Sequence, residues 1–116
     1  MDSKKLKHIE LFAGCGGMSL GLDSSGFKLF FANELSPMAG ETFAFNILNE
    51  DLHSKALNKD DAKRVNWIRS GFSRNALVER LRENPMKARY GGFTDIKGIE
   101  DLKDKLIVGD IDQLLE

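Results

Sequence analysis

The most constraining feature of this 116-residue sequence is a glycine-rich segment near its start. The run Glu-Leu-Phe-Ala-Gly-Cys-Gly-Gly-Met-Ser-Leu-Gly, residues 10–21, places four glycines within eight residues, directly after an apolar stretch. The pattern before the glycines predicts a short strand over 7–12, and the pattern after them predicts a helix over 18–24. A strand, a glycine turn and a helix together are typical of the first unit of a parallel α/β sheet.

The rest of the chain continues this alternation. Further strands are predicted over 28–33 and 105–109, and a helix is predicted to start at Ser36 or Pro37, because apolar residues recur there at helical spacing. Weaker patterns predict helices over 60–69 and 75–83, and Asp112 can cap a final turn. Strands that alternate with helices predict a parallel sheet with crossover helices.

Each predicted strand ends at a group suited to ligand binding, and ligands of parallel α/β sheets lie beyond the carboxyl ends of the strands. The glycine turn follows the first strand, Glu34 follows the second and Asp110 follows the third. Glycines 14, 16 and 17 let the backbone approach a ligand, and N–H groups at a helix start favour a carboxylate or phosphate. Glu34 can accept both hydroxyls of a ribose, and Asp110 can accept an exocyclic amine such as that of adenine.

Each of these features has a simpler interpretation when it is taken alone. A glycine turn also caps helices, Glu34 could be a solvated strand end, and Asp110 or Asp112 could be a helix N-cap. The three features together, each at a strand end, favour a nucleoside-type ligand.

The identity of that nucleoside depends on the spacing of the glycines. The dinucleotide fingerprint G-x-G-x-x-G is met by Gly14 and Gly16 but has Ser19 in its third position, and because serine is small this leaves NAD open. If Glu34 binds the ribose and Asp110 binds the adenine, only the glycine turn remains to bind the pyrophosphate of a dinucleotide. An adenosine joined to an amino acid therefore fits better.

These residues resemble the N-terminal part of the DNA cytosine-5 methyltransferases. Leu-Phe-Ala-Gly-Cys-Gly-Gly-Met at 11–18 is similar to the first motif of that family, Asn-Glu at 33–34 to its second, and Gly-Asp-Ile at 109–111 to its third. The resemblance implies an α/β, Rossmann-like parallel sheet of the S-adenosylmethionine-dependent methyltransferase type. Here it would be incomplete, with the first three strands, their helices and a helical insertion.

The resemblance implies S-adenosylmethionine as cofactor, S-adenosylhomocysteine as its product, and no metal. The glycine turn would hold the methionine end, Glu34 the ribose, and Asp110 with Ile111 the adenine. Leu35 takes the position where many members place an aromatic residue against the adenine. The implied cofactor-binding residues are Phe12, Ala13, Gly14, Cys15, Gly16, Gly17, Met18, Glu34, Leu35, Asp110 and Ile111.

The resemblance also implies that the single cysteine, Cys15, is not the nucleophile of the methyl-transfer reaction. In this family the nucleophile lies in a Pro-Cys pair on a loop after the third motif, and it attacks a cytosine flipped out of the duplex. Pro37 and Pro85 both precede methionine, so these residues contain no Pro-Cys pair, and they contain no Glu-Asn-Val motif. We therefore expect that these residues include no catalytic residue. We also expect that they form an N-terminal fragment or one subunit of a split enzyme. The enzyme would act on double-stranded DNA with the missing catalytic and target-recognition part. The alternative is a non-catalytic module that uses the same pocket for an adenosine ligand or a nicotinamide cofactor.

Glu34 and Asp110 are 76 residues apart, whereas a crossover unit needs about 30. An insertion is therefore predicted at about 52–92, and residues 53–90 carry ten Lys/Arg against four Asp/Glu. This basic segment could contact DNA phosphates, or its charges could form a solvated helical face. In the structural interpretation, it is a helical elaboration with a small satellite core of Trp67, Ile68, Phe72, Leu77 and Leu81.

Composition limits where such a chain works. One cysteine excludes an internal disulfide framework, the two histidines match no zinc pattern, and no 18 apolar residues run together. The N-terminus lacks the apolar region of a signal peptide. We expect a cytoplasmic protein of a bacterium or phage that does not contact a membrane and that serves DNA methylation, including restriction-modification.

Replacement of Cys15 by Ala or Ser is expected to leave methyl transfer by the complete enzyme within a few-fold. A position in the glycine turn needs small size and a backbone N–H, and a thiol adds nothing to either. The measurements are methyl transfer and formation of a covalent adduct with a mechanism-based cytosine analogue. Loss of that adduct in Cys15→Ala would identify Cys15 as the nucleophile.

Overall fold

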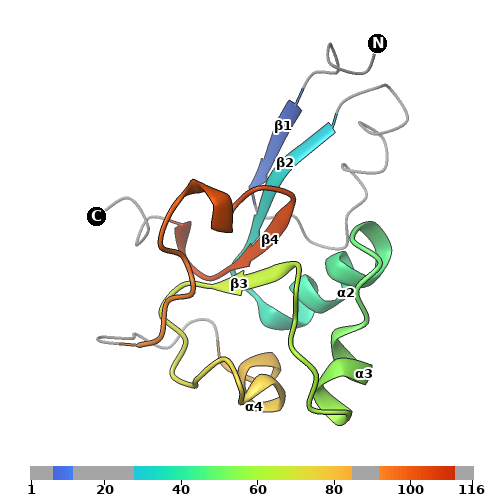
Figure 1. Ribbon diagram of the computed structural model, residues 1–116, viewed down its shortest axis with the longest axis vertical. Helices are drawn as coiled ribbons and strands as arrows, with labels where there is room; N and C mark the ends of the chain where they lie inside the picture. The colour runs from blue at the N-terminus through green and yellow to red at the C-terminus, as the bar shows by residue number, and fades with distance from the viewer. Residues whose placement is uncertain (1–6, 12–27, 85–91, 112–116) are drawn as a thin grey trace.

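The structure is a computed structural model that describes residues 7–11, 28–84 and 92–111 (Figure 1). Its elements in chain order are strand β1 (Lys7–Leu11), strand β2 (Lys28–Glu34), helix α2 (Pro37–Ile47), helix α3 (Leu52–Leu57), strand β3 (Val65–Trp67), helix α4 (Leu77–Leu81), the 3-10 turn η2 (Ile99–Asp101) and strand β4 (Lys105–Val108). The strands form one sheet in the order β1-β2-β4-β3, and all three neighbouring pairs are parallel. The predicted parallel α/β fold is confirmed.

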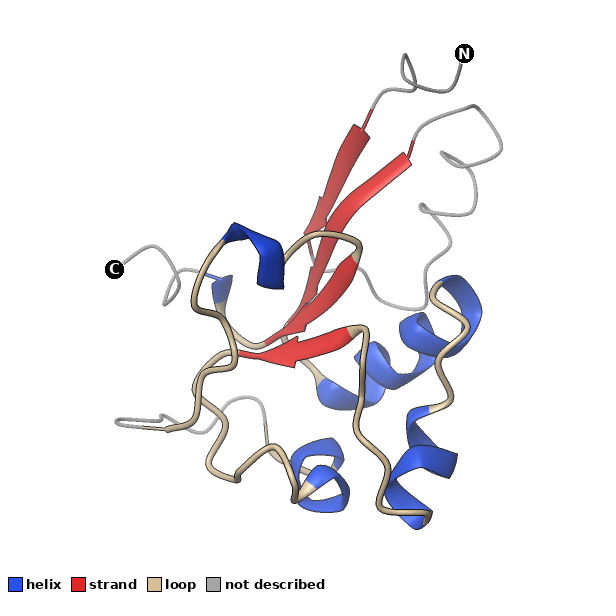
Figure 2. Cartoon of the chain, viewed as in Figure 1, coloured by secondary structure: helices blue, strands red, loops and turns tan. Residues whose placement is uncertain are grey.

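The two faces of the sheet carry separate apolar clusters, because successive residues of a strand point to opposite faces. In β4, Leu106 and Val108 belong to one cluster and Ile107 to the other. Helices α2, α3 and α4 cover the first face with the buried side chains Phe43, Ala44, Leu52 and Leu77. Figure 2 shows these helices grouped on the same side of the strands. The second cluster is smaller, with Phe31, Ile68 and Ile107 at its centre.

Several predicted elements are present with small shifts in their ends. The strands predicted over 28–33 and 105–109 are observed as β2 and β4, and the strand predicted over 7–12 is β1. Helix α2 starts at Pro37, with the hydroxyl of Ser36 as N-cap acceptor for the N–H of Ala39 at 3.4 Å. The helix predicted over 75–83 is the shorter α4. The helix predicted over 18–24 and the turn capped by Asp112 lie outside the described residues.

Helix α2 approaches the sheet closely at Gly40. A Cβ atom built there would lie 3.2 Å from methyl groups of both Leu106 and Val108, so a larger residue would push the helix away from β4. This contact places the start of α2 beside the strand ends that the candidate site uses.

The predicted helix over 60–69 is wrong, since Val65–Trp67 is strand β3. Its three residues are buried and pair with Leu106, Ile107 and Val108 of β4. A strand of three residues is too short to show an alternating pattern in the sequence. The segment 52–92 is therefore not purely helical, because it supplies an edge strand of the sheet.

The predicted satellite core also does not form. Trp67 and Leu77 are buried in the main cluster, with Leu81 packed against it, because β3 places Trp67 and α4 places the two leucines on the first face of the sheet. Ile68 belongs to the second cluster, and Phe72 is exposed. The segment is thus packed into the single body of the sheet.

An ion cluster around Asp95 attaches the long connection between β3 and β4 to the sheet. One carboxylate oxygen, Oδ2, accepts from the backbone N–H of Trp67 at 2.9 Å, from Arg80 at 2.7 Å and from Arg74 at 3.0 Å. Arg80 is fully buried, and its guanidinium lies 5.1 Å from the centre of the Trp67 ring. Arg74 also pairs with the exposed Asp61 at 2.8 Å. Two guanidinium groups and a strand N–H therefore depend on one carboxylate.

A second buried carboxylate, Glu50, holds the chain between α3 and β3. Its two oxygens accept the backbone N–H groups of Lys63 and Arg64 at 2.9 and 2.8 Å, and it pairs with Lys55. Burial raises the pKa of Glu50, but the hydrogen bonds from Lys55, Arg64 and Lys63 outweigh it and lower the pKa below its ordinary value of 4.5. The ionised Glu50 carboxylate thus holds the backbone of the two residues that precede β3.

Replacement of Asp95 by Asn is expected to lower the free energy of unfolding by about 3–5 kcal/mol. The amide keeps the shape but leaves the buried Arg80 without its counter-charge. Asp61→Asn is the matched control, because it removes an exposed partner of Arg74 and should cost less than about 1 kcal/mol. Urea denaturation of both variants measures the difference, and equal losses would contradict the role given to Asp95.

Candidate ligand-binding site at the strand ends

The carboxyl ends of β2 and β4 lie side by side in the middle of the sheet. Glu34 pairs with Val108, and the N–H of Gly109 donates to the carbonyl oxygen of Glu34 at 2.9 Å. The last residue of β2 and the residue that precedes Asp110 are therefore hydrogen-bonded to each other. The structure brings together two of the three predicted strand ends, although they are 76 residues apart in sequence.

The third strand end lies at the same edge of the sheet. Strand β1 ends at Leu11, which pairs with Asn33 of β2. The predicted turn residues 12–18, with Cys15 among them, lie outside the described residues, so their part in the site stays a prediction.

Glu34 is almost buried, with 8% of its surface exposed. Its Oε2 atom accepts the N–H of Ser36 at 3.0 Å, and Ser36 in turn caps α2. A carboxylate held this way has a fixed orientation, and its hydrogen bonds to a ligand hydroxyl would be charge-assisted and little screened by water.

Asp110 is exposed beyond the end of β4, and it differs from Glu34 in this respect. Ile111, which follows it, is half-buried against the second apolar cluster, and Leu35 is half-buried beyond β2. This edge of the sheet therefore carries an accessible carboxylate, a nearly buried carboxylate and partly exposed apolar side chains. Such a combination suits a ligand with both an apolar ring and amine or hydroxyl donors.

Sequence reasoning assigned no role to the side chain of Asn33, although Asn33 precedes Glu34. This side chain is buried, with 1% exposed, and its amide nitrogen donates to the carbonyl oxygens of Ile107 at 3.0 Å and Gly109 at 2.9 Å. A polar residue inside an otherwise apolar strand was the available signal, because a buried amide needs partners.

Several arginines of the basic segment make hydrogen bonds and ion pairs with other parts of the fold. Arg74 and Arg80 belong to the cluster around Asp95, and Arg64 donates to the carbonyl oxygens of Leu48 and Asp104. Part of the positive charge of this segment therefore stabilises the fold. A contact of this segment with DNA phosphates stays a prediction.

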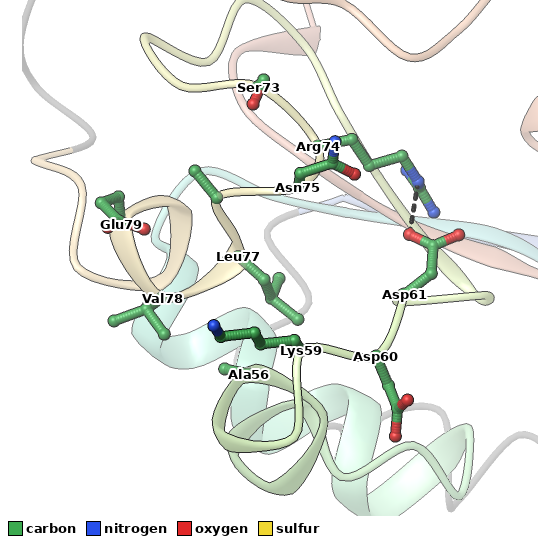
Figure 3. Close-up of a pocket in the computed structure, with 11 residues that line it drawn as sticks. Ala56, Lys59, Asp60, Asp61, Ser73, Arg74, Asn75, Leu77, Val78 and Glu79 are labelled. Atoms are coloured by element: carbon green, nitrogen blue, oxygen red, sulfur yellow. Dashed lines mark hydrogen bonds and ion pairs between the residues drawn. The ribbon is translucent and has the colours of Figure 1, made fainter.

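An open groove of about 570 Å³ lies between the end of α3 and the segment that leads into α4 (Figure 3). Figure 3 shows the ion pair of Asp61 and Arg74 at one side of it. Its lining consists of Ala56, Lys59, Asp60, Asp61, Ser73, Arg74, Asn75, Ala76, Leu77, Val78 and Glu79. None of these is a predicted cofactor-binding residue, so the groove is separate from the strand-end site.

Within 7–11, 28–84 and 92–111, no three His, Cys, Asp or Glu side chains gather in a way that could hold a metal ion. The helices in the same ranges are all too short or too polar to cross a membrane.

Comparison with known proteins identifies the family of this chain. The sequence model described as C-5 cytosine-specific DNA methylase matches residues 6–72, which is 67 of the 116 residues. This region contains β1, β2, α2, α3 and β3, and it includes Glu34.

Curated relatives agree with this match. The type II methyltransferase M.NgoFVII of Neisseria gonorrhoeae is 44% identical over 46 residues, which cover 40% of this chain and 12% of that protein. The putative type II methyltransferase M.OihORF3336P of Oceanobacillus iheyensis is 35% identical over 60 residues, 51% of this chain and 13% of that protein. The type II methyltransferase M.PspPI of Psychrobacter is 32% identical over 75 residues, 60% of this chain and 18% of that protein. The aligned region spans less than a fifth of each relative, and no solved structure matches the chain significantly.

Proposed function

We propose, from the premise that this chain belongs to the C-5 cytosine-specific DNA methylase family, that its strand-end site binds S-adenosylmethionine. The chain would form the first part of the cofactor-binding portion of a DNA cytosine-5 methyltransferase, and S-adenosylhomocysteine would be its product. The observation that carries the proposal is the hydrogen bond from Gly109 to Glu34, which sets two acidic residues at neighbouring strand ends.

The chemistry of the side chains at this edge fits such a cofactor. Glu34 is a nearly buried acceptor suited to the two ribose hydroxyls, and Asp110 is an exposed acceptor suited to the amine of adenine. Ile111 and Leu35 add apolar surface on which a purine ring can pack. The predicted turn at 12–18 would hold the methionine end with its backbone N–H groups.

The bound cofactor supplies an electrophilic methyl group for C5 of cytosine. The residues of this chain would bind and orient it, because the adenosine moiety held by Glu34 and Asp110 determines where the methyl group points. The attacking thiolate and the groups that hold the cytosine would come from the catalytic and target-recognition part of the complete enzyme or from a complementary subunit. Double-stranded DNA would be the partner, and a role in restriction-modification follows the type II names of the relatives. The bacterial relatives favour action in the cytoplasm of a bacterium or phage-infected cell.

Replacement of Glu34 by Ala is expected to weaken S-adenosylmethionine binding by about 10 to 150-fold, because charge-assisted hydrogen bonds of about 1.5–3 kcal/mol are lost. Titration calorimetry on the full-length protein measures the affinity. Glu79→Ala, which removes a carboxylate from the separate groove of Figure 3, is the control and should leave the affinity within twofold. Unchanged binding in Glu34→Ala would remove this assignment, and NAD as a competitor tests the dinucleotide alternative.

Residues 1–116 by themselves are not expected to methylate DNA, because they contain neither a Pro-Cys pair nor a Glu-Asn-Val motif. Without the attacking thiolate, C5 of cytosine is not activated toward the methyl group. The measurement is transfer of a tritiated methyl group, with and without a separately expressed downstream polypeptide that contains Pro-Cys. Activity of 1–116 alone would contradict the prediction, and activity only after mixing would favour a split enzyme.

A further inference from the structure

We infer that Asn33 is a positioning residue that sets the preference of the strand-end site for adenine. It would do so without touching the ligand, by fixing the peptide that leads into Asp110. The inference rests on the proposed function, since it concerns how that site recognises the base of its cofactor.

The first step of the argument is the unusual backbone at Gly109. Its φ is +131°, and a Cβ atom built there would lie 2.8 Å from the carbonyl oxygen of Ile68, so only glycine fits. Glycine has no side chain to restrict its own dihedral angles, and the direction of the chain after it must be set by external contacts. Asp110 follows directly.

The second step is the pair of hydrogen bonds from Asn33. Its Nδ2 atom carries two hydrogens and donates to the carbonyl oxygens of Ile107 and Gly109, at 3.0 and 2.9 Å. The carbonyl of Gly109 and the N–H of Asp110 belong to one planar peptide group. A bond to that carbonyl therefore fixes the orientation of the peptide from which the Asp110 side chain departs.

The third step is that both polar groups of the Gly109 backbone are held by neighbouring residues of β2. Asn33 directly precedes Glu34, whose own carbonyl oxygen accepts the N–H of Gly109 at 2.9 Å. The side chain of Asn33 and the backbone of Glu34 thus hold Gly109 from its carbonyl and its N–H. The separation between the proposed ribose acceptor and the proposed adenine acceptor is set by this clamp.

The fourth step is why an amide is needed. A carboxylate at position 33 has the same shape but no hydrogen to donate, and it would face two carbonyl oxygens in a buried place. The peptide before Asp110 would turn away from it. The Asp110 carboxylate would then lose its alignment with the base, while Glu34 would still face the ribose.

The experiment compares two ligands on the full-length protein, S-adenosylhomocysteine and its inosine analogue, in which the 6-amine of adenine is a carbonyl. Asp110 can accept from the amine but repels the carbonyl, so the unchanged protein should prefer the adenine compound by at least about tenfold. In Asn33→Asp the preference should fall to within about threefold. Asn33→Ser keeps one donor and provides a second variant should Asn33→Asp fail to fold, and it should show an intermediate preference.

Asn66→Asp is the matched control. Asn66 is a buried asparagine on β3 that pairs with the same Ile107, but its side chain donates to the carbonyl oxygen of Asp101 and accepts from Arg74. Any loss of affinity in Asn66→Asp should be equal for the two ligands, so this variant should retain the preference for adenine.

The possible outcomes separate the two proposals. Failure of the unchanged protein to bind S-adenosylhomocysteine contradicts the proposed function itself. If the protein binds S-adenosylhomocysteine and both Asn33 variants retain the preference for adenine, the positioning role is overturned and the proposed function stands. The same holds if Asn66→Asp loses the adenine preference as much as the Asn33 variants do. Binding without any preference in the unchanged protein also overturns it. A preference lost in the Asn33 variants alone supports it.

Discussion

The parallel pairing of β2 with β4 is the interaction on which the candidate site depends. Four consecutive pairs join these strands, from Phe31 with Lys105 to Glu34 with Val108. The ladder ends in the N–H of Gly109, which donates to the carbonyl oxygen of Glu34. Because parallel strands end at the same edge, this register sets two acidic residues from distant parts of the chain next to each other. A shift by one residue would turn Glu34 to the other face of the sheet.

The long connection between the two strands is compatible with this pairing because it is anchored inside the fold. β3 adds an edge strand to β4, and Asp95 ties the following loop to β3 through Trp67, Arg74 and Arg80. The carboxylate is only 12% exposed, so its ion pairs are weakly screened, and removal of one partner would leave a buried charge uncompensated. Part of the positive charge that suggested a surface for polyanions therefore belongs to the interior.

Much of the fold was predictable from local pattern. The apolar runs of β2 and β4 and the Ser36-Pro37 start of α2 have signals within a few residues, and the structure confirms them. β3 and the packing of Trp67 were not predictable, because a three-residue strand exists only through its partner β4. The predicted helix over 60–69 is wrong for that reason. The cofactor-binding role of Glu34, Leu35, Asp110, Ile111 and the turn 12–18 stays a prediction.

The sequence by itself determined the class of fold and the family. The glycine-rich segment, Asn-Glu and Gly-Asp-Ile are local in the chain and carry the resemblance to the methyltransferases. Only the tertiary structure decided which strands are neighbours, which arginines are buried and which side chain holds Gly109. The physical reason is that these depend on contacts across about 15 to 76 residues of chain. Asn33 shows the difference most clearly: its place before Glu34 is visible in the sequence, and its two bonds to β4 arise only when the strands pair.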